Sequence, residues 1–395
     1  MIATSALSRL QPILRSLTDP VDGWLLFDFR GINPIMSAVV GPEVVGTRRS
    51  YVFFPREGQP AALVHAIDQE LWRAWPAEWP KRIWVQREEL GAALTELVGG
   101  KRIAAEYSPR GNVPYADYLP AGTAELLRSL GATLASSSEL VTRYLSAWSP
   151  QDQAGHIRAA EHLRRIAREA TLLAGQRART ADPISEGDLA RWVLAAIERA
   201  GLVTESSPSV CYGPNAARNH YDPAAATSSD PIVPGNLLLL DLWATEPGRI
   251  YADQTYMASI GEPTARQQEL WAVIRDARDA ALGLLRSRAS AREPVFGAEA
   301  DRAARQVIRR AGYLGYTQCR TGHSIDHFGL HGYGPTLDDT ESFDQRLLVP
   351  GAGFSVEPGI YFPGEVGVRS EVDACMGDGE LLVTPASPQH DLWVV

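Results

Sequence analysis

The chain has 395 residues and a formal net charge of −9, with 45% hydrophobic and 22% charged residues. This length allows two or three domains with a core each, and the composition is that of a soluble globular protein. Because the chain is acidic, we expect neither nucleic acid nor an anionic membrane surface as a partner. No apolar run approaches the roughly 20 residues of a transmembrane helix, and the N-terminal stretch has no signal-peptide core.

The three cysteines, Cys211, Cys319 and Cys375, lie far apart in the sequence and form no CxxC motif. This usage is typical of a reducing compartment, so we expect a cytoplasmic protein without disulfides. The pattern assigns no chemistry to any of the three thiols.

Residues 1–148 alternate strand-like and helix-like segments and predict an α/β domain with a small sheet. The predicted strands cover residues 23–29, 50–55, 61–66, 82–85 and 102–107, and the predicted helices cover 87–98 and 121–130. Arg48 and Arg49 stand at the mouth of the second strand. A solvated strand end is the ordinary interpretation of such a pair.

A second domain is predicted for residues 149–395. Ser149, Pro150 and Asp152 form the pattern of a helix start, with a cap, a first-turn proline and an acid three residues after the cap. Three further helices are predicted to begin near Ser185, Thr264 and Ala298. A long helix, a shorter helix and a β-hairpin therefore occur twice, which indicates a duplicated unit.

The first predicted hairpin carries two aspartates. The apolar run 237–240 leads to Asp241, and a second strand-like run leads to Asp253 after a breaker at Pro247. Both acids are equidistant from Pro247, so we expect them opposite each other on one face. Two facing like charges beside a buried strand are costly, and something positive should lie between them.

The second predicted hairpin repeats this arrangement with glutamates. Glu357 and Glu371 are equidistant from Gly364, which places them opposite each other as well. Each acid by itself fits a surface or salt-bridged residue equally well. Two symmetric pairs, each after an apolar strand, favour instead the oxygen ligands of a two-metal centre.

Four of the eight histidines are candidates for the nitrogen donor that a first-row metal would still need: His220, His323, His327 and His331. The last three lie in a glycine-rich loop between the two hairpins. His220 lies in a loop just before the first hairpin, a position that suits an outer hydrogen-bond donor or a proton carrier.

Together these residues resemble the signature of the pita-bread metallopeptidases, in which five ligands follow in the order Asp241, Asp253, His323, Glu357 and Glu371. The motifs TGHSI, FSVEPGIY and VGVRSEVD look like the Xaa-Pro branch, which contains the prolidases and Xaa-Pro aminopeptidases. The resemblance implies an α+β protein: a pita-bread catalytic domain at 149–395 and a smaller creatinase/prolidase-like α/β domain at 1–148.

The resemblance also implies a cofactor. Two divalent ions would be bridged by Asp253 and Glu371, with Asp241 on one ion and His323 and Glu357 on the other. An oxygen-rich site with one imidazole fits Mn²⁺ first, with Co²⁺ or Zn²⁺ possible.

Three further roles follow from the family pattern. Glu357 would accept the proton of the bridging water, His220 and His331 would contact the substrate carbonyl and the leaving nitrogen, and Arg369 would brace the ligands. His331 lies one residue further from His323 than the family spacing, and His327 is additional.

The expected activity is hydrolysis of the Xaa-Pro bond, most simply of dipeptides, by a homodimer. The arginine that many prolidases carry after the second accessory histidine is missing, since GYGP stands there. Arg48 and Arg49 are therefore our candidates for reading the substrate carboxylate. The alternatives are an Xaa-Pro aminopeptidase acting on longer peptides, and a creatinase-like amidinohydrolase or binding module on the same fold.

Overall fold

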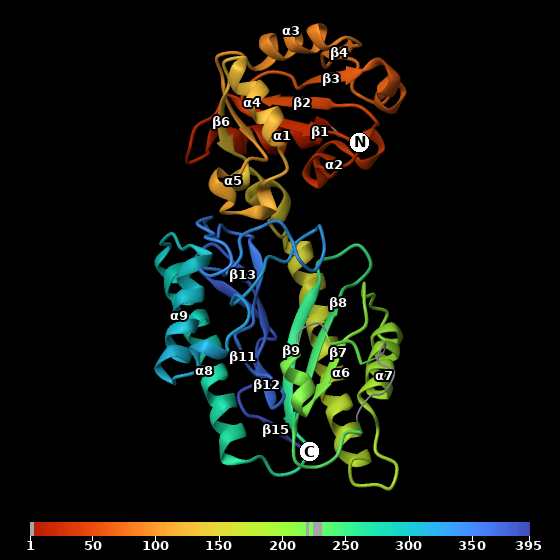
Figure 1. Cartoon of the computed structure of the whole chain (residues 1–395), viewed down its shortest axis with the longest axis vertical. Helices are drawn as coiled ribbons and strands as arrows, with labels where there is room; N and C mark the ends of the chain where they lie inside the picture. Colours follow the sequence, from red (N-terminus) through yellow and green to blue (C-terminus); the bar gives the residue numbers. More distant parts are fainter. Residues whose placement is uncertain (1–3, 219–220, 224–230) are drawn as a thin grey trace. The chain divides into compact units, whose positions relative to one another are not determined.

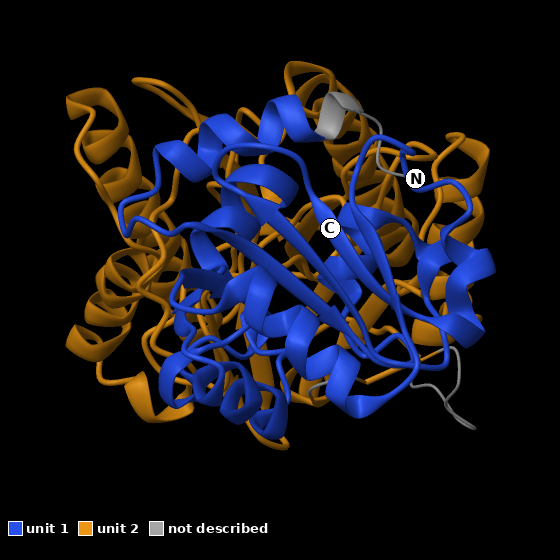
Figure 2. Ribbon diagram, turned by 90° about the horizontal axis from the view of Figure 1, so that it is seen from above, with its two compact units in different colours: residues 1–145 blue, residues 146–395 orange. Residues whose placement is uncertain are grey.

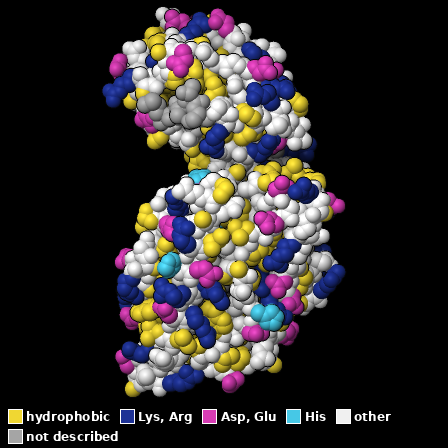
Figure 3. Space-filling view, turned by 180° about the vertical axis from the view of Figure 1, so that it is seen from behind, with side chains coloured by type: hydrophobic (Ala, Val, Ile, Leu, Met, Phe, Trp, Pro, Cys, Tyr) yellow, Lys and Arg dark blue, Asp and Glu magenta, His cyan; other side chains and the backbone are white. Residues whose placement is uncertain are grey.

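The computed structural model describes residues 4–218, 221–223 and 231–395. The chain forms two compact units, Met1–Leu145 and Ser146–Val395, which Figure 2 shows in different colours. Among the described residues, no helix has both the length and the apolar character needed to cross a membrane. On the face seen in Figure 3, Lys and Arg side chains are interspersed with Asp and Glu, which is typical of a solvated surface.

The N-terminal unit is built on a six-stranded sheet in the order β4-β3-β2-β1-β5-β6. Its strands are β1 (Gly23–Asp28), β2 (Ser50–Pro55), β3 (Ala61–His65), β4 (Lys81–Trp84), β5 (Arg102–Ala105) and β6 (Thr133–Ser136). Its longer helices are α1 (Thr4–Arg15), α2 (Pro34–Val40), α3 (Arg87–Val98) and α4 (Ala121–Ser129). The predicted strands and helices of this unit are confirmed, whereas the sequence patterns predicted neither α1 and α2 nor the short, largely polar β6.

A buried carboxyl group ties this unit together. Glu106 follows β5 and is 1% exposed. It accepts hydrogen bonds from Trp24 Nε1 (2.7 Å), Asn33 Nδ2 (2.7 Å) and Ser137 Oγ (3.0 Å). Burial raises the pKa of Glu106 to about 7, although the three donors favour the charged form and oppose the rise. The proton on Glu106 is therefore bound more tightly in the folded chain than in the unfolded one.

This shift predicts a pH-dependent stability. The stabilisation is complete below the unfolded pKa near 4.5 and is lost as the pH rises through about 7. Glu106→Gln cannot ionise, so its free energy of unfolding should gain about 3 kcal/mol relative to the parent between pH 4.5 and pH 8. Urea unfolding of the full chain at several pH values measures this difference. A difference that stays constant with pH would contradict the assignment.

The C-terminal unit contains the repeated order that the sequence predicted. Its first half consists of α6 (Pro150–Arg177), α7 (Glu186–Arg199), β7 (Ser209–Tyr212), β8 (Leu237–Ala244) and β9 (Ala252–Ser259). Its second half consists of α8 (Ala265–Ala291), α9 (Gly297–Arg310), β10 (Gly353–Val356), β11 (Gly359–Phe362), β12 (Val366–Arg369), β13 (Val372–Met376) and β14 (Leu381–Thr384), followed by β15 (Trp393–Val394). In Figure 1 the strands lie between the α6–α7 pair and the α8–α9 pair.

The predicted helix starts are confirmed by their caps. Ser149 and Thr264 begin α6 and α8 with capping boxes that use Asp152 and Gln267, respectively. Ser185 caps α7 by accepting from the backbone of Asp188. Each cap satisfies amide groups that the first helical turn leaves without partners.

Strand alternation divides the first half into a packed face and a cleft face. In β8 and β9 the even-numbered residues pack against α6 and α7, as Leu238, Leu240 and Tyr256 do. The odd-numbered residues Leu237, Leu239 and Met257 belong to the core shared with the second half. Because successive side chains alternate between faces, Asp241 and Asp253 lie on the inner face with these odd-numbered residues.

The predicted pairing of the two aspartates is wrong by two residues. In the β8–β9 ladder Asp241 lies opposite Thr255, and Asp253 lies opposite Trp243. The ladder is centred on Gly248, which has a φ of 73°, and not on Pro247. A shift of two residues keeps the side chains on the same face, so the two acids are diagonal neighbours.

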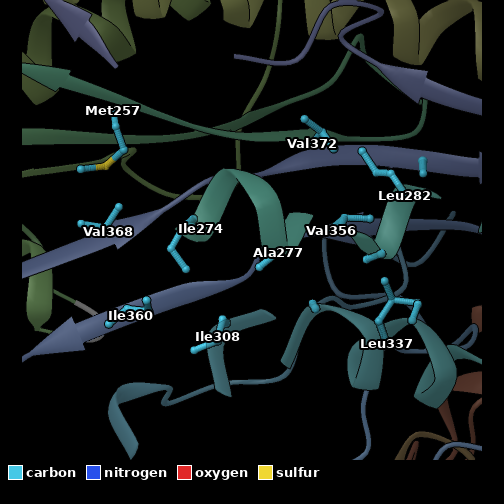
Figure 4. Packing of buried hydrophobic residues seen from close by; sticks show 14 of the residues in the cluster. Met257, Ile274, Ala277, Leu282, Ile308, Leu337, Val356, Ile360, Val368 and Val372 are labelled. Carbon is cyan, nitrogen blue, oxygen red and sulfur yellow. The ribbon is translucent and has the colours of Figure 1, made fainter. Parts of the chain in front are cut away.

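The second half is divided in the same way. Its even-numbered strand residues pack against α8 and α9, where Figure 4 shows Val356, Ile360, Val368 and Val372 around Ile274. Odd-numbered residues then point to the opposite, inner face. These include Ser355, Glu357, Tyr361, Arg369, Glu371 and Asp373.

The predicted register of the second hairpin is confirmed. In the β11–β12 ladder Gly359 pairs with Arg369, and in the β10–β13 ladder Val356 pairs with Val372. Both ladders are symmetric about residue 364. Glu357 and Glu371 occupy the break between the two ladders, where the backbone leaves regular pairing and the side chains can converge.

A close backbone approach holds the loop that carries His323. A Cβ atom on Gly322 would lie 2.0 Å from Ser355 O, so only glycine fits there. We expect Gly322→Ala to destabilise the protein by about 1–3 kcal/mol because the loop must move away from β10. Gly283→Ala, on the exposed side of α8 with no atom within 4 Å, is the matched control. It should stabilise by about 0.5–1 kcal/mol, and equal effects on thermal unfolding would contradict the prediction.

Candidate metal centre

The inner faces of the two halves enclose a cavity of about 700 Å³. All five predicted metal ligands line this cavity: Asp241, Asp253, His323, Glu357 and Glu371. Their side chains are only 2–14% exposed. The structure thus brings together residues that lie up to 130 positions apart in the sequence.

Three of these residues offer converging ligand atoms. One atom each from Asp253, His323 and Glu371 lies within 4.8 Å of the others. His323 Nε2 lies 3.4 Å from Asp253 Oδ2 and 3.5 Å from Glu357 Oε1. Asp253 Oδ1 is buried and has no hydrogen-bond partner in the described residues. A divalent cation fits this donor set, because it would supply the partner that a buried carboxylate oxygen requires.

Arg369 connects the acids of the two halves. Its guanidinium forms an ion pair with Asp241 and donates from Nε to Thr255 Oγ1 at 2.9 Å. Its Nη1 also lies 3.8 Å from Glu357 Oε2, and its Nε lies 3.9 Å from Glu371 Oε2. The Thr255 hydroxyl in turn donates to Glu371 Oε2 at 2.7 Å. Arg369 therefore lies where the family pattern expects a residue that braces the ligands.

The electrostatics of the cavity favour a bound cation. Burial raises the pKa of Asp241 to about 7, and the charge of Arg369 opposes this rise. Burial and the charge of Asp253 also raise the pKa of Glu371 well above its ordinary range. For His323, burial lowers the pKa, but the hydrogen bond to Asp253 and the charge of Glu357 outweigh it and the net shift is upward. A divalent ion would relieve this repulsion among buried anions.

The histidines separate into different environments. His331 is exposed, lines the cavity and lies with its ring 4.2 Å from the His323 ring, centroid to centroid. The Nε2 atom of His327 lies instead 3.3 Å from Oδ2 of Asp152, at the start of α6. Of these two, His331 lines the cavity, and its role as an accessory histidine stays a prediction. His220 lies outside the described residues.

Arg48 and Arg49 belong to the N-terminal unit. Arg48 is exposed, and its backbone N–H donates to Asp68 Oδ2 at 2.7 Å. The Arg49 guanidinium lies 5.7 Å from the centre of the Trp84 ring. The part that these arginines play toward a substrate stays a prediction.

Sequence reasoning missed several side chains of the cavity wall: Trp243, Arg320, Tyr361 and the thiols of Cys211 and Cys319. Trp243 and Tyr361 share strand parity with the acids, a signal that could have found them. Arg320 lies in a loop, where no periodicity points to it. It faces the exposed Glu341 at 3.7 Å.

Another arginine near the site is accounted for by the loop itself. Arg346 is buried, pairs with Asp344 and donates to the carbonyl oxygens of Tyr333 and Gly334. Its hydrogen-bonding groups hold the loop after His331.

Solved structures share this architecture over nearly the whole chain. Dipeptidase PepE from Mycobacterium ulcerans has a TM-score of 0.72 at 20% identity and covers 99% of this chain and 97% of its own. The Xaa-Pro dipeptidase from Bacillus anthracis has a TM-score of 0.63 at 20% identity, with full coverage of both chains. The predicted α+β pita-bread fold is confirmed by this likeness and defines the class of the protein.

The sequence profile of metallopeptidase family M24 matches residues 155–377, more than half of the chain. The chain therefore belongs to metallopeptidase family M24, as its motifs predicted.

Two curated relatives extend the comparison. Over 173 residues the chain is 34% identical to the Xaa-Pro dipeptidase of Lactobacillus helveticus, a match that spans only 42% of that relative and 43% of this chain. Over 352 residues it is 26% identical to the probable dipeptidase PepE of Mycobacterium tuberculosis, spanning 86% of that relative and 88% of this chain.

Proposed function

We propose that the protein is a two-metal peptidase that hydrolyses the Xaa-Pro bond, most readily in dipeptides. The observation that carries this proposal is the convergence of five ligand-type side chains on one buried cavity. The name of the Lactobacillus helveticus relative, an Xaa-Pro dipeptidase, supports the choice of substrate.

In this proposal Asp253 and Glu371 would serve both ions, Asp241 would hold one of them, and His323 and Glu357 would hold the other. Mn²⁺ is our preferred metal because oxygen donors outnumber nitrogen in the set. When bound, the ions would supply Lewis acidity and a water of lowered pKa. The expected homodimer and the cytoplasmic location remain predictions from the sequence.

The protein's own residues then direct the proton and the substrate. Glu357 accepts the proton of the attacking water and delivers it to the leaving nitrogen, which in an Xaa-Pro bond carries no hydrogen and must gain one. His331, beside His323 on the cavity wall, donates a hydrogen bond to the substrate carbonyl as charge develops on it. His220 is proposed to share this task.

The metal centre is tested by removing a bridging acid. Glu371→Ala and Asp253→Ala should each abolish turnover and lower the metal content below the roughly two ions per chain expected for the parent. The matched control is Glu341→Ala, an exposed acid on the same cavity that lies outside the ligand cluster. The Glu341→Ala variant should keep the metal content of the parent. Metal analysis and Xaa-Pro hydrolysis decide the matter, and near-normal hydrolysis in a bridging-acid variant would refute the centre.

Dipeptide preference requires a cation that reads the substrate carboxylate. We propose Arg48 and Arg49 for this role. Their double alanine variant should raise KM for Xaa-Pro about tenfold or more, the scale of one charged hydrogen bond. Cleavage of Xaa-Pro-Yaa should stay unchanged or improve.

Arg320→Ala is the comparison, because this arginine lines the cavity in the C-terminal unit. If the double variant matches the parent on both substrates while Arg320→Ala loses dipeptide affinity, Arg320 is the reader. A parent enzyme that cleaves tripeptides better than dipeptides would support the Xaa-Pro aminopeptidase alternative.

A further inference from the structure

The edge of β9 that faces the second half pairs with β15 only at Ala258 and Ser259, and side chains bind to it before that point. On its other edge β9 pairs with β8 along its whole length. On the facing edge the N–H of Asp253 donates to Asp373 Oδ2 at 2.9 Å. Further along, Gln389 accepts from Met257 N at 3.0 Å and donates to Met257 O at 2.7 Å. These two side chains, both from the second half, satisfy backbone groups of β9 that precede its pairing with β15.

Asp373 reaches this edge of β9 from the second half, close to the candidate metal ligands. We call the boundary between the two halves of the C-terminal unit the seam. It lies in β13 two residues after Glu371, so both side chains point to the same face. It is fully buried, and its Oδ1 has no hydrogen-bond partner in the described residues. Burying a carboxyl oxygen that has no hydrogen-bond partner costs folding free energy. The single hydrogen bond that it does accept comes from the backbone of a candidate metal ligand.

A buried histidine lies beside Asp373 and is held by other partners. His156 of α6 is fully buried and places Nε2 3.4 Å from Asp373 Oδ2. Its Nδ1 lies 2.7 Å from Tyr251 O, which can only accept, so Nδ1 carries the hydrogen. Nε2 then accepts from the hydroxyl of Thr384 at 2.6 Å. Burial lowers the pKa of His156 to about 4, which keeps the ring neutral.

We propose that Asp373 is a positioning residue that sets Asp253 relative to Glu371 and thereby shapes the metal site. Asp253 comes from the first half and Glu371 from the second. Asp373 accepts a hydrogen bond from the backbone of Asp253 and lies in β13, which begins directly after Glu371. Metal coordination tolerates errors of only about 0.2 Å, so this bond across the seam controls ligand geometry. The inference rests on the proposed two-metal centre.

The test is a calorimetric titration of the metal-free full-length protein with Mn²⁺ alone. Asp373→Ala should weaken Mn²⁺ binding about tenfold or more, the usual effect of losing a partner that orients a ligand. Asp373→Asn keeps an oxygen that can accept from Asp253 N–H and should bind Mn²⁺ close to the parent level. Gln389→Ala is the matched control, since it removes side-chain bonds from the same edge four residues further along. It should lower thermal stability and leave Mn²⁺ affinity unchanged.

Unchanged Mn²⁺ affinity in Asp373→Ala would overturn the inference, as would an equal loss in Gln389→Ala. If the alanine variant does not fold, Asp373→Leu, of similar size and without an acceptor, takes its place with the same expected loss. A parent that binds no Mn²⁺, Co²⁺ or Zn²⁺ refutes the proposed metal centre itself. A parent that binds metal but does not cleave Xaa-Pro refutes only the activity, and the metal titrations still decide the role of Asp373.

Discussion

The C-terminal unit is organised around the burial of four carboxylates in one cavity. Each group loses hydration there and repels the others, and Arg369, which contacts Asp241 and lies within 4 Å of Glu357 and Glu371, offsets only part of this cost. Such a cluster exists only if other interactions hold the strands together. The apolar faces of the same strands provide them, packed on α6 and α7 in one half and on α8 and α9 in the other.

Alternation along the strands lets one short segment serve both purposes. Val356 and Val372 belong to the core, while the adjacent Glu357 and Glu371 face the cavity. A ligand is therefore never more than one residue from a fully packed neighbour, and its backbone has little freedom to move. Rigid strands of this kind position the side chains that contact a metal more accurately than loops do.

The two halves are joined at the site by polar contacts in both directions. Arg369 of the second half binds Asp241 of the first, and Thr255 of the first half donates to Glu371 of the second. Asp373 adds a bond to the backbone of Asp253. The geometry of the cavity thus depends on how the halves meet, so a change at this seam reaches several candidate ligands at once.

Local periodicity in the sequence was enough to predict the helix starts, the repeated order of elements and the face on which each acid lies, because caps and strand alternation involve only near neighbours. Local periodicity did not predict the register of the first hairpin, since the turn is centred on Gly248 and not on Pro247. The sequence also could not reveal Arg320, because loop positions follow no period. Only the tertiary structure brought Asp373 to Asp253, 120 residues away, since that contact depends on how the two halves of the C-terminal unit pack.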